Sequence, residues 1–297
     1  MNVYHGHQFT INAVGIACDS LTVDPRITAF AEGAGASSVN TLSGMKMSEP
    51  IIKGTTRDIK ALIDQVTVAG YVVTGASTSK VIAYIAKEAD GYGYTAGSTH
   101  KSITVNKGLV VIDSISARGT DAATASFTVY ALFDGTNNPF VVASSVALPG
   151  TPAALSNIWV CGKANIDGTD YETQSIDLQI GPQVSLARKD GELYPRFVHI
   201  DKYDFKASID TLDAAALELN GLCEDSILYF QKHSANTETR VAAATEEHIS
   251  VTIATAYMQP KSASLPWPGQ ASFGVDLTPV YNGTDSTIAI DTTAAIA

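Results

Sequence analysis

The sequence predicts a mainly β protein, a tandem duplication of an antiparallel β-sandwich or barrel domain with a flanking α-helix. Apolar and polar residues alternate in several segments, Gly-containing turn dipeptides punctuate the chain, and short motifs recur in the same order in its two halves. Period-two alternation is typical of half-buried strands. The length of 297 residues is enough for two domains of ordinary size.

The alternation is clearest in segments that fall at matching places in the two halves. Their apolar positions are Phe127, Val129, Ala131 and Phe133; Phe273, Val275 and Leu277; Ile249, Val251 and Ile253; and Ile103 with Val105. Turn dipeptides that can supply the positive φ of hairpin turns lie at Asp90-Gly91, Asp134-Gly135, Asp167-Gly168, Asp190-Gly191 and Asn282-Gly283. The strands are therefore expected to be mainly antiparallel.

The internal repeat rests on several anchors. Ile103-Thr104-Val105 matches Ile249-Ser250-Val251 with an offset of 249 − 103 = 146, and the offset becomes 283 − 135 = 148 at two Gly-Thr turns, which implies a two-residue insertion. Upstream, Lys87 corresponds to Lys232 (232 − 87 = 145) and Pro25 to Pro182 (182 − 25 = 157). The second copy is therefore expected to be shorter between these anchors.

A shared content of Thr, Ser, Val and Ala is the alternative explanation, because it makes any two β-rich segments look alike. Anchors in one order, with slowly drifting offsets, favour duplication. The Pro-rich turn Leu148–Pro152 is suited to joining domains. The first domain is therefore expected at residues 1–150 and the second at residues 151–297.

Three segments break the strand pattern. Ile209–Leu219 is rich in helix formers and predicts a helix packed on the sheet, and Arg57–Asp64 predicts its counterpart, with Thr56 as a possible cap. Ala31–Gly54 is rich in Gly, Ala and Ser and predicts a long loop in which the copies differ most. Such loops are usually functional or disordered. The soft side chains of Met45 and Met47 suit contact with a partner, or filling of a local core.

Bulk properties narrow the class of protein. The net charge of −11 opposes tight binding to nucleic acid or to an anionic membrane. No secretory signal is evident at the start and no run approaches the roughly 18 apolar residues of a membrane helix, so synthesis in a cytoplasm without membrane insertion is expected. Cys18, Cys161 and Cys223 are an odd number without C-x-x-C spacing, which predicts reduced and mostly buried thiols.

Motifs that carry chemistry are scarce. His5 and His7 lie two apart, so one strand face could present both to a metal, although a solvated polar pair explains them as well. The carboxylates of Asp201, Asp204, Asp210 and Asp213 are close in sequence, but acids near a helix start are explained by the helix dipole. The other histidines, His100, His199, His233 and His248, are expected at the surface or satisfied inside. No catalytic residue and no cofactor is expected.

The C-terminal stretch carries a resemblance. It runs from Ile249–Ile253 through Ala256–Leu265, with Met258 shortly before Pro260, to Gly269–Phe273. It resembles the closing strands of tail tube proteins, also called major tail proteins, of long-tailed bacteriophages. Asp190-Gly191, the segment Phe197–Asp201 and the helix predicted after it also fit such a domain.

This resemblance implies a structural virion protein of the tail. Six β-sandwich domains, each flanked by a helix, would close into a ring, and stacked rings would form a tube that conducts genomic DNA during ejection. In the two-domain type three chains make one pseudo-hexameric ring. The implied partners are further copies of the chain, other tail proteins at the tube ends, and DNA that passes without tight binding.

Within this interpretation the segment that contains Met45 and Met47, together with Ser37 and Ser48, is expected to contact the next ring. Two alternatives stay open. One is another β-rich virion component, such as a capsid decoration or baseplate protein. The other is a carbohydrate-active β-sandwich enzyme in which acids such as Asp201 and Glu224 would be candidates.

Overall fold

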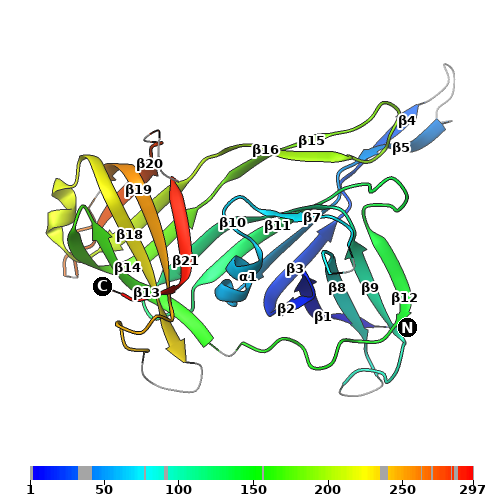
Figure 1. The fold of residues 1–297 in the computed structure, drawn as a ribbon, viewed down its shortest axis with the longest axis horizontal. Helices are drawn as coiled ribbons and strands as arrows, with labels where there is room; N and C mark the ends of the chain where they lie inside the picture. Colours follow the sequence, from blue (N-terminus) through cyan, green and yellow to red (C-terminus); the bar gives the residue numbers. More distant parts are fainter. Residues whose placement is uncertain are drawn as a thin grey trace.

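The computed structural model describes residues 3–32, 42–76, 78–89, 93–155, 157–234, 240–261, 263–268, 270–281, 283 and 287–296. Over these residues the protein is mainly β and antiparallel, as predicted, and its two halves repeat one arrangement of strands. Figure 1 shows two β-rich lobes side by side, the first coloured blue to green and the second green to red, with long strands running between them.

The second unit is a closed antiparallel barrel of six strands. Its strands follow the order β13 (Asn157–Ile166), β18 (Gly221–Ser234), β19 (His248–Pro260), β20 (Phe273–Pro279), β17 (Lys206–Thr211) and β14 (Thr169–Gln179). Pairing of β13 with β14 closes the circle. Strand β21 (Ile288–Ala294) pairs with β19, and the hairpin β15–β16 (Pro182–Ala187 and Phe197–Tyr203) leaves the barrel as an arm.

The first unit follows the same path with two interruptions. Its strands are β1 (Tyr4–Ile11), β2 (Val14–Ile16), β3 (Cys18–Asp24), β6 (Ile51–Thr56), β8 (Val81–Lys87), β9 (His100–Val105), β10 (Gly108–Arg118), β11 (Thr124–Ala131) and β12 (Val141–Val146). Strands β2 and β3 together correspond to β14, and β9 and β10 together to β19. The hairpin β4–β5 (Ile27–Glu32 and Leu42–Ser48) is the counterpart of the β15–β16 arm, and a short β7 (Tyr71–Val73) pairs with β10.

Strand pairing demonstrates the duplication residue by residue. Cys18 pairs with Thr56 in the first unit as Thr173 pairs with Thr211 in the second, and 173 − 18 = 211 − 56 = 155. In both units the next pair is displaced by the same bulge, before Ser20 and before Ser175. Bulges are specific backbone features, so their recurrence at equivalent places is strong evidence for a common ancestral unit.

The pairing corrects the offsets expected from sequence. Ala83 pairs with Ile103 and Leu228 with Val251, so Ile103 corresponds to Val251 (251 − 103 = 148), not to Ile249. The offset is also 148 where Gly108 pairs with Ala131 and Ala256 with Pro279. The two-residue insertion is therefore wrong. The residues matched by sequence are two positions away from the true register, and a shift of two positions along a strand keeps the same side chains facing inward.

The expected long loop at Ala31–Gly54 is also wrong over its described residues. The segment contains strand β5 and the start of β6, and Ser37 lies outside the described residues. Ile27 pairs with Ser48 as Pro182 pairs with Tyr203, again with an offset of 155 (182 − 27) and with a bulge at the same step. The repeat therefore extends through this segment. Its Gly, Ala and Ser residues are compatible with strands because a projecting hairpin has little core to fill.

The helix predictions are half right. Helix α1 spans Ile59–Gln65, close to the expected segment; its N-cap residue is Asp58, and the hydroxyl of Thr56 accepts from the Asp58 N–H at 2.9 Å. In the second unit the expected start of the helix is wrong, because Ile209–Thr211 belongs to strand β17. Only a short 3-10 helix, η1 (Ala214–Glu218), follows, capped by the Asp213 side chain. Ile209 is buried through its pairing in the barrel, which overrides local helix propensity.

Candidate assembly interface

The two units are joined by a strand pairing. The second half of β10 pairs antiparallel with β14, from Ser114 opposite Gln179 to Arg118 opposite Ser175. One β-sheet therefore continues from the first unit into the second. The apolar residues Ile115, Ala117, Ile176 and Leu178 on one face of this junction are all buried, with exposed fractions of 2% or less.

The hairpin between β10 and β11 carries this contact deeper into the second unit. The backbone N–H of Gly119 donates to the Gln174 carbonyl at 2.6 Å, and the N–H of Ala123 donates to the Trp159 carbonyl at 2.6 Å. Both donors lie in the turn that connects the strands. The first unit thus inserts a hairpin against an edge of the second unit's barrel.

A polar groove of about 500 Å³ lies along the junction and is lined by Asp113, Ser116, Asp177 and Lys206, among others. The Asp113 carbonyl accepts from the Ile180 N–H at 2.9 Å. Burial raises the pKa of the Asp113 carboxyl, while a hydrogen bond from the Thr128 hydroxyl at 2.7 Å and the charge of Lys53 oppose the rise. The groove is therefore part of the contact between units, and the Thr128 hydroxyl holds the Asp113 carboxylate in place there.

The β15–β16 arm supplies a second contact by reaching back over the first unit, where its tip lies beside β4–β5 (Figure 1). The Ser48 N–H donates to the Leu193 carbonyl at 2.9 Å, and the Phe133 N–H donates to the Pro195 carbonyl at 2.9 Å. The Arg196 guanidinium lies over the Phe133 ring at 5.1 Å. Two backbone N–H groups of the first unit thus donate to carbonyls of the arm and hold it against that unit.

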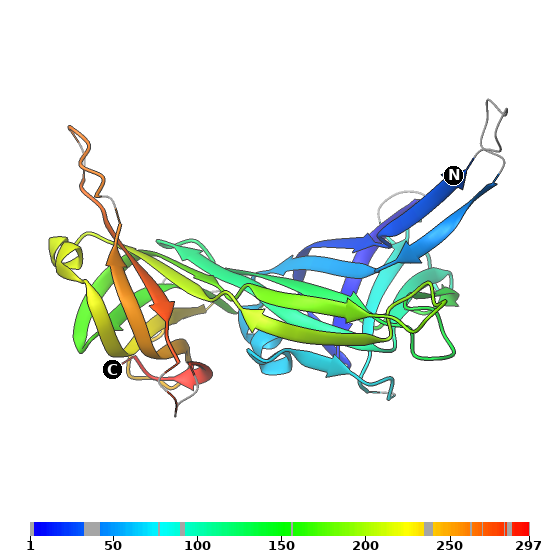
Figure 2. The ribbon, with the colours of Figure 1, turned by 90° about the horizontal axis from the view of Figure 1, so that it is seen from above.

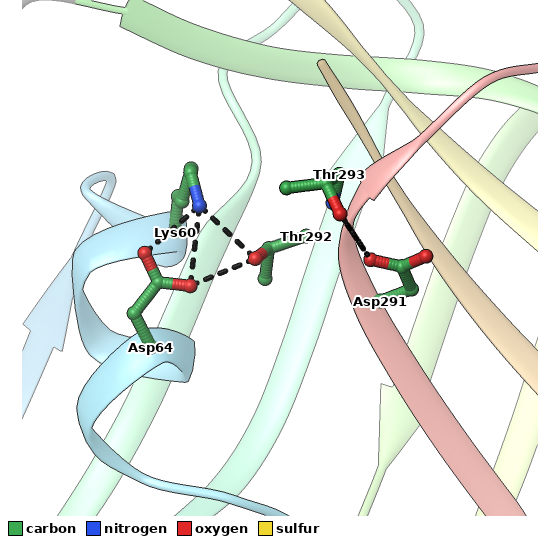
Figure 3. A network of polar contacts seen from close by, with 5 residues as sticks. All are labelled: Lys60, Asp64, Asp291, Thr292 and Thr293. Atoms are coloured by element: carbon green, nitrogen blue, oxygen red, sulfur yellow. Dashed lines mark hydrogen bonds and ion pairs between the residues drawn. The ribbon is translucent and has the colours of Figure 1, made fainter. Parts of the chain in front are cut away.

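A polar contact joins helix α1 to strand β21 (Figure 3). The Lys60 ammonium pairs with the Asp64 carboxylate at 2.8 Å and donates to the Thr292 hydroxyl at 3.0 Å, and that hydroxyl donates to Asp64 at 2.8 Å. In the repeat, Lys60 and Asp64 correspond to Ala215 and Leu219 (215 − 60 = 219 − 64 = 155). This network is therefore specific to the junction inside the chain.

The equivalents of the joined elements stand free at the two ends of the molecule. Figure 2 shows the β4–β5 hairpin projecting at one end and the β19–β20 connection projecting at the other. In the latter, Leu265 is 71% and Trp267 98% exposed. On the first unit, β3 pairs with β6 but forms, within the described residues, no second pairing like that of β14 with β10. Neither Leu265 nor Trp267 was expected from sequence to be a contact residue, although this apolar pair, which flanks Pro266 in a Ser-rich segment, is unusual.

The histidines expected as metal candidates do not form a shared site. His5 Nε2 lies 3.2 Å from the Glu88 carboxylate, whereas the His7 ring packs edge-on against Tyr94 at 5.3 Å. A bulge between Gly6 and Gln8 places His7 outside the regular register, so the alternation on which a shared face depends is interrupted. Among the described residues no group of three or more His, Cys, Asp or Glu is arranged to hold a metal ion.

The acids singled out in the sequence have separate structural partners. On the arm, Asp201 accepts from the Ser185 hydroxyl and lies 2.7 Å from His199, and Asp204 pairs with Lys202 at 2.8 Å. In the barrel, Asp210 accepts from Ser175 at 2.7 Å. Glu224 is exposed on β18, opposite Thr255. The three cysteines are free thiols, with Cys161 and Cys223 buried and Cys18 half-buried.

The residues expected to contact a next ring lie on β5 or beyond the described part. Met45 and Met47 are half-buried, opposite Ala29 and Thr28 of the same hairpin. Ser48 is buried, and its hydroxyl donates to the Pro25 carbonyl. Ser37 lies outside the described residues.

Comparison with known proteins finds no match, either among protein-family models or among curated proteins. Neither of the helices in the described residues is long and apolar enough to cross a membrane. The candidate site is therefore defined by the molecule's own geometry: a contact between two equivalent units, whose complementary halves are also present, exposed, on the other unit of each pair.

Proposed function

We propose that this chain is a structural virion protein that assembles into stacked rings, forming the tail tube of a long-tailed bacteriophage through which genomic DNA passes. The observation that carries the proposal is the contact between units. The first unit offers the β10–β11 hairpin and the second accepts it on β14, so the two surfaces in contact are different surfaces of equivalent units.

A contact between different surfaces is heterologous, and repeating it gives a closed ring or an open filament. Each chain already contains one such contact and exposes both halves of a second. Three chains joined in this way would present six equivalent units. Closure would also cover the free edge of β3, and exposed edges are a liability in a β-rich protein.

The net charge of −11 supports the role as a conduit. An acidic lumen would repel DNA phosphates, so that the duplex slides without being held. Assembled tubes are therefore expected not to retain duplex DNA in an electrophoretic mobility assay at about 50 mM salt, a condition that favours electrostatic binding. Retention of DNA at that salt would contradict the sliding mechanism.

The inter-ring contact is assigned to the exposed β4–β5 hairpin, with Met45 and Met47 as the candidate contact residues. Because Ser48 is buried, point changes test this better than a deletion. The double variant Met45→Ser, Met47→Ser is expected to form rings that stack poorly. Tubes of normal length from this variant would contradict the assignment.

Negative-stain electron microscopy of the purified chain, combined with analytical ultracentrifugation, tests the function. Stacked rings or hollow tubes are the expected result. Single rings that never stack would favour another ring-shaped virion component, and a monomer at all concentrations and salts would refute self-assembly.

A further inference from the structure

We infer that the free edge of β3 is the acceptor for residues 263–266 of a second copy of this chain, in the antiparallel register by which β14 accepts β10 within the chain. The inference rests on the proposed ring assembly and specifies its contact between chains. It places Ser264 of one copy opposite Thr22 of the next.

The register follows from the two offsets of the repeat. Within the chain Ser116 pairs with Asp177. The counterpart of Ser116 is Ser264, because 264 − 116 = 148, and the counterpart of Asp177 is Thr22, because 177 − 22 = 155. The bridge between Ser264 and Ser272 reproduces the pairing of Ser116 with Thr124, so this part of the second unit already has the required backbone form.

The side chains repeat the pattern of the internal junction. Ile115 opposite Leu178 and Ala117 opposite Ile176 form its apolar face, with the polar pair Ser116 and Asp177 between them. The corresponding pairs between chains are Ala263 with Val23 and Leu265 with Leu21, with Ser264 and Thr22 between them. Apolar faces apolar and polar faces polar at each of these steps, which is the requirement for a half-buried antiparallel pair.

Exposure distinguishes the occupied junction from the free one. In the occupied junction Ile115 and Ile176 are fully buried. In the free one Leu265 is 71% exposed, and Thr22 and Ser264 are exposed as well. Trp267, the counterpart of Gly119 (267 − 119 = 148), is 98% exposed beside them. A pair of large, exposed apolar side chains on a projecting hairpin is typical of a protein–protein contact surface.

The chemistry of the edge favours a second copy over an unrelated partner. Segment 263–266 is the repeat counterpart of the donor strand β10, and β3 is the counterpart of its acceptor β14, so a second copy of the chain supplies the partner that each of them matches. They lie on different units, because β3 belongs to the first unit and residues 263–266 follow β19 of the second. One chain can therefore use both at once, each with a different neighbour.

Disulfide trapping tests the register. The variant Thr22→Cys, Ser264→Cys is made in a Cys18→Thr background, which copies Thr173 of the second unit and removes the nearby native thiol. Directly opposed residues of an antiparallel pair are within disulfide reach. Oxidation of the assembled protein is expected to give covalent dimers and trimers on a non-reducing gel.

Two controls share this background. Ser116→Cys, Asp177→Cys places the same pair at the internal junction and should form its bridge within one chain, leaving the mass of a monomer. Thr22→Cys, Leu265→Cys moves one thiol to the opposite face of the strand, and its cross-linking should be about tenfold slower. Equal cross-linking by this mismatched pair would overturn the register.

A non-covalent variant covers the case in which the new cysteines disturb folding. Leu265→Asp should weaken association about tenfold or more, while Leu222→Asp, a change at a residue that is 67% exposed on β18, should not. Both variants should melt at the temperature of the parent chain. Unchanged association of Leu265→Asp would overturn the inference.

Failure of this contact and failure of the proposed function give different results. Rings or tubes in the microscope without the specific cross-link would refute the β3 pairing and leave the function standing. Specific cross-links without tubes would support the pairing and refute the function. A monomer that neither assembles nor cross-links would refute both.

Discussion

The backbone N–H of Lys232 donates a hydrogen bond to Nδ1 of His248 at 3.0 Å, and the backbone N–H of Lys87 donates to Nδ1 of His100 at 3.0 Å. Both imidazoles are buried, with 0% and 2% exposed. Since Nδ1 accepts, the hydrogen of His248 is on Nε2, which donates to the Ala242 carbonyl at 2.9 Å. These histidines are the satisfied interior histidines expected from sequence, and each links two neighbouring strands of its unit.

Replacing His248 with Ala is expected to lower the free energy of unfolding by about 2–4 kcal/mol, because it orphans a buried N–H and a carbonyl and leaves a cavity. His100→Ala should have an effect of the same sign in the first unit. Chemical denaturation measures both. His199→Ala, at an exposed residue on the arm, is the control and should change stability by less than about 0.5 kcal/mol. A loss for His248→Ala no larger than that of the control would show that the bond has no structural role.

Ala13 adopts the left-handed conformation, with φ of 63°, in the turn after β1, and its counterpart in the second unit is Gly168, with φ of 77°. A residue with a Cβ is strained there, whereas glycine is not. Ala13→Gly is therefore expected to stabilise the protein by about 0.5–1 kcal/mol, and Gly168→Ala to destabilise it by about 1 kcal/mol. Thermal melting of the pair checks the signs, and destabilisation by Ala13→Gly would contradict the argument.

Gly54 pairs with Phe127, and a Cβ at position 54 would meet the Phe127 ring at 2.4 Å. The equivalent pair in the second unit is Ile209 with Val275, so there two side chains of intermediate size replace the very small and the very large one. Gly54→Ala is expected to cost about 1–3 kcal/mol through overpacking. Adding Phe127→Val should recover part of that cost, so the two changes should be non-additive in a double-mutant cycle. Additive losses would mean that the two side chains do not compete for space.

Burial, followed by the negative charges of Asp19 and Asp58, raises the pKa of the Cys18 thiol to about 12. The ordinary value is 9.0, so the shift stabilises the folded protein fully below about pH 9 and that contribution is lost as the pH rises toward 12. At pH 8 the thiolate is scarce, and alkylation of Cys18 should be on the order of a hundredfold slower in the folded than in the denatured protein. Peptide mapping after iodoacetamide treatment measures this, and equal rates would contradict it.

Strand character could be predicted from sequence because alternation is local. Phe127 and Val129 on β11, and Val275 and Leu277 on β20, are buried as the period-two pattern indicates. The helix after β17 was overestimated because Ile209 and Thr211 follow the barrel pairing instead of their local propensity. The offsets of 155 and 148 residues between the two units could be obtained only from the strand pairing in the structure. A shift by two residues leaves the same face inward, so the alternation in the sequence does not distinguish one register from the other.

Composition and periodicity are properties of a few residues at a time, so they are enough to predict a mainly β, duplicated and acidic protein. How the two units meet depends on contacts between distant segments, which exist only in the folded chain. The pairing of Ser116 with Asp177 joins residues far apart in the chain, and nothing local distinguishes the occupied edge of β14 from the free edge of β3. The candidate interface follows from the difference between these two edges, because the same pair of surfaces is buried where the units meet and exposed where they do not.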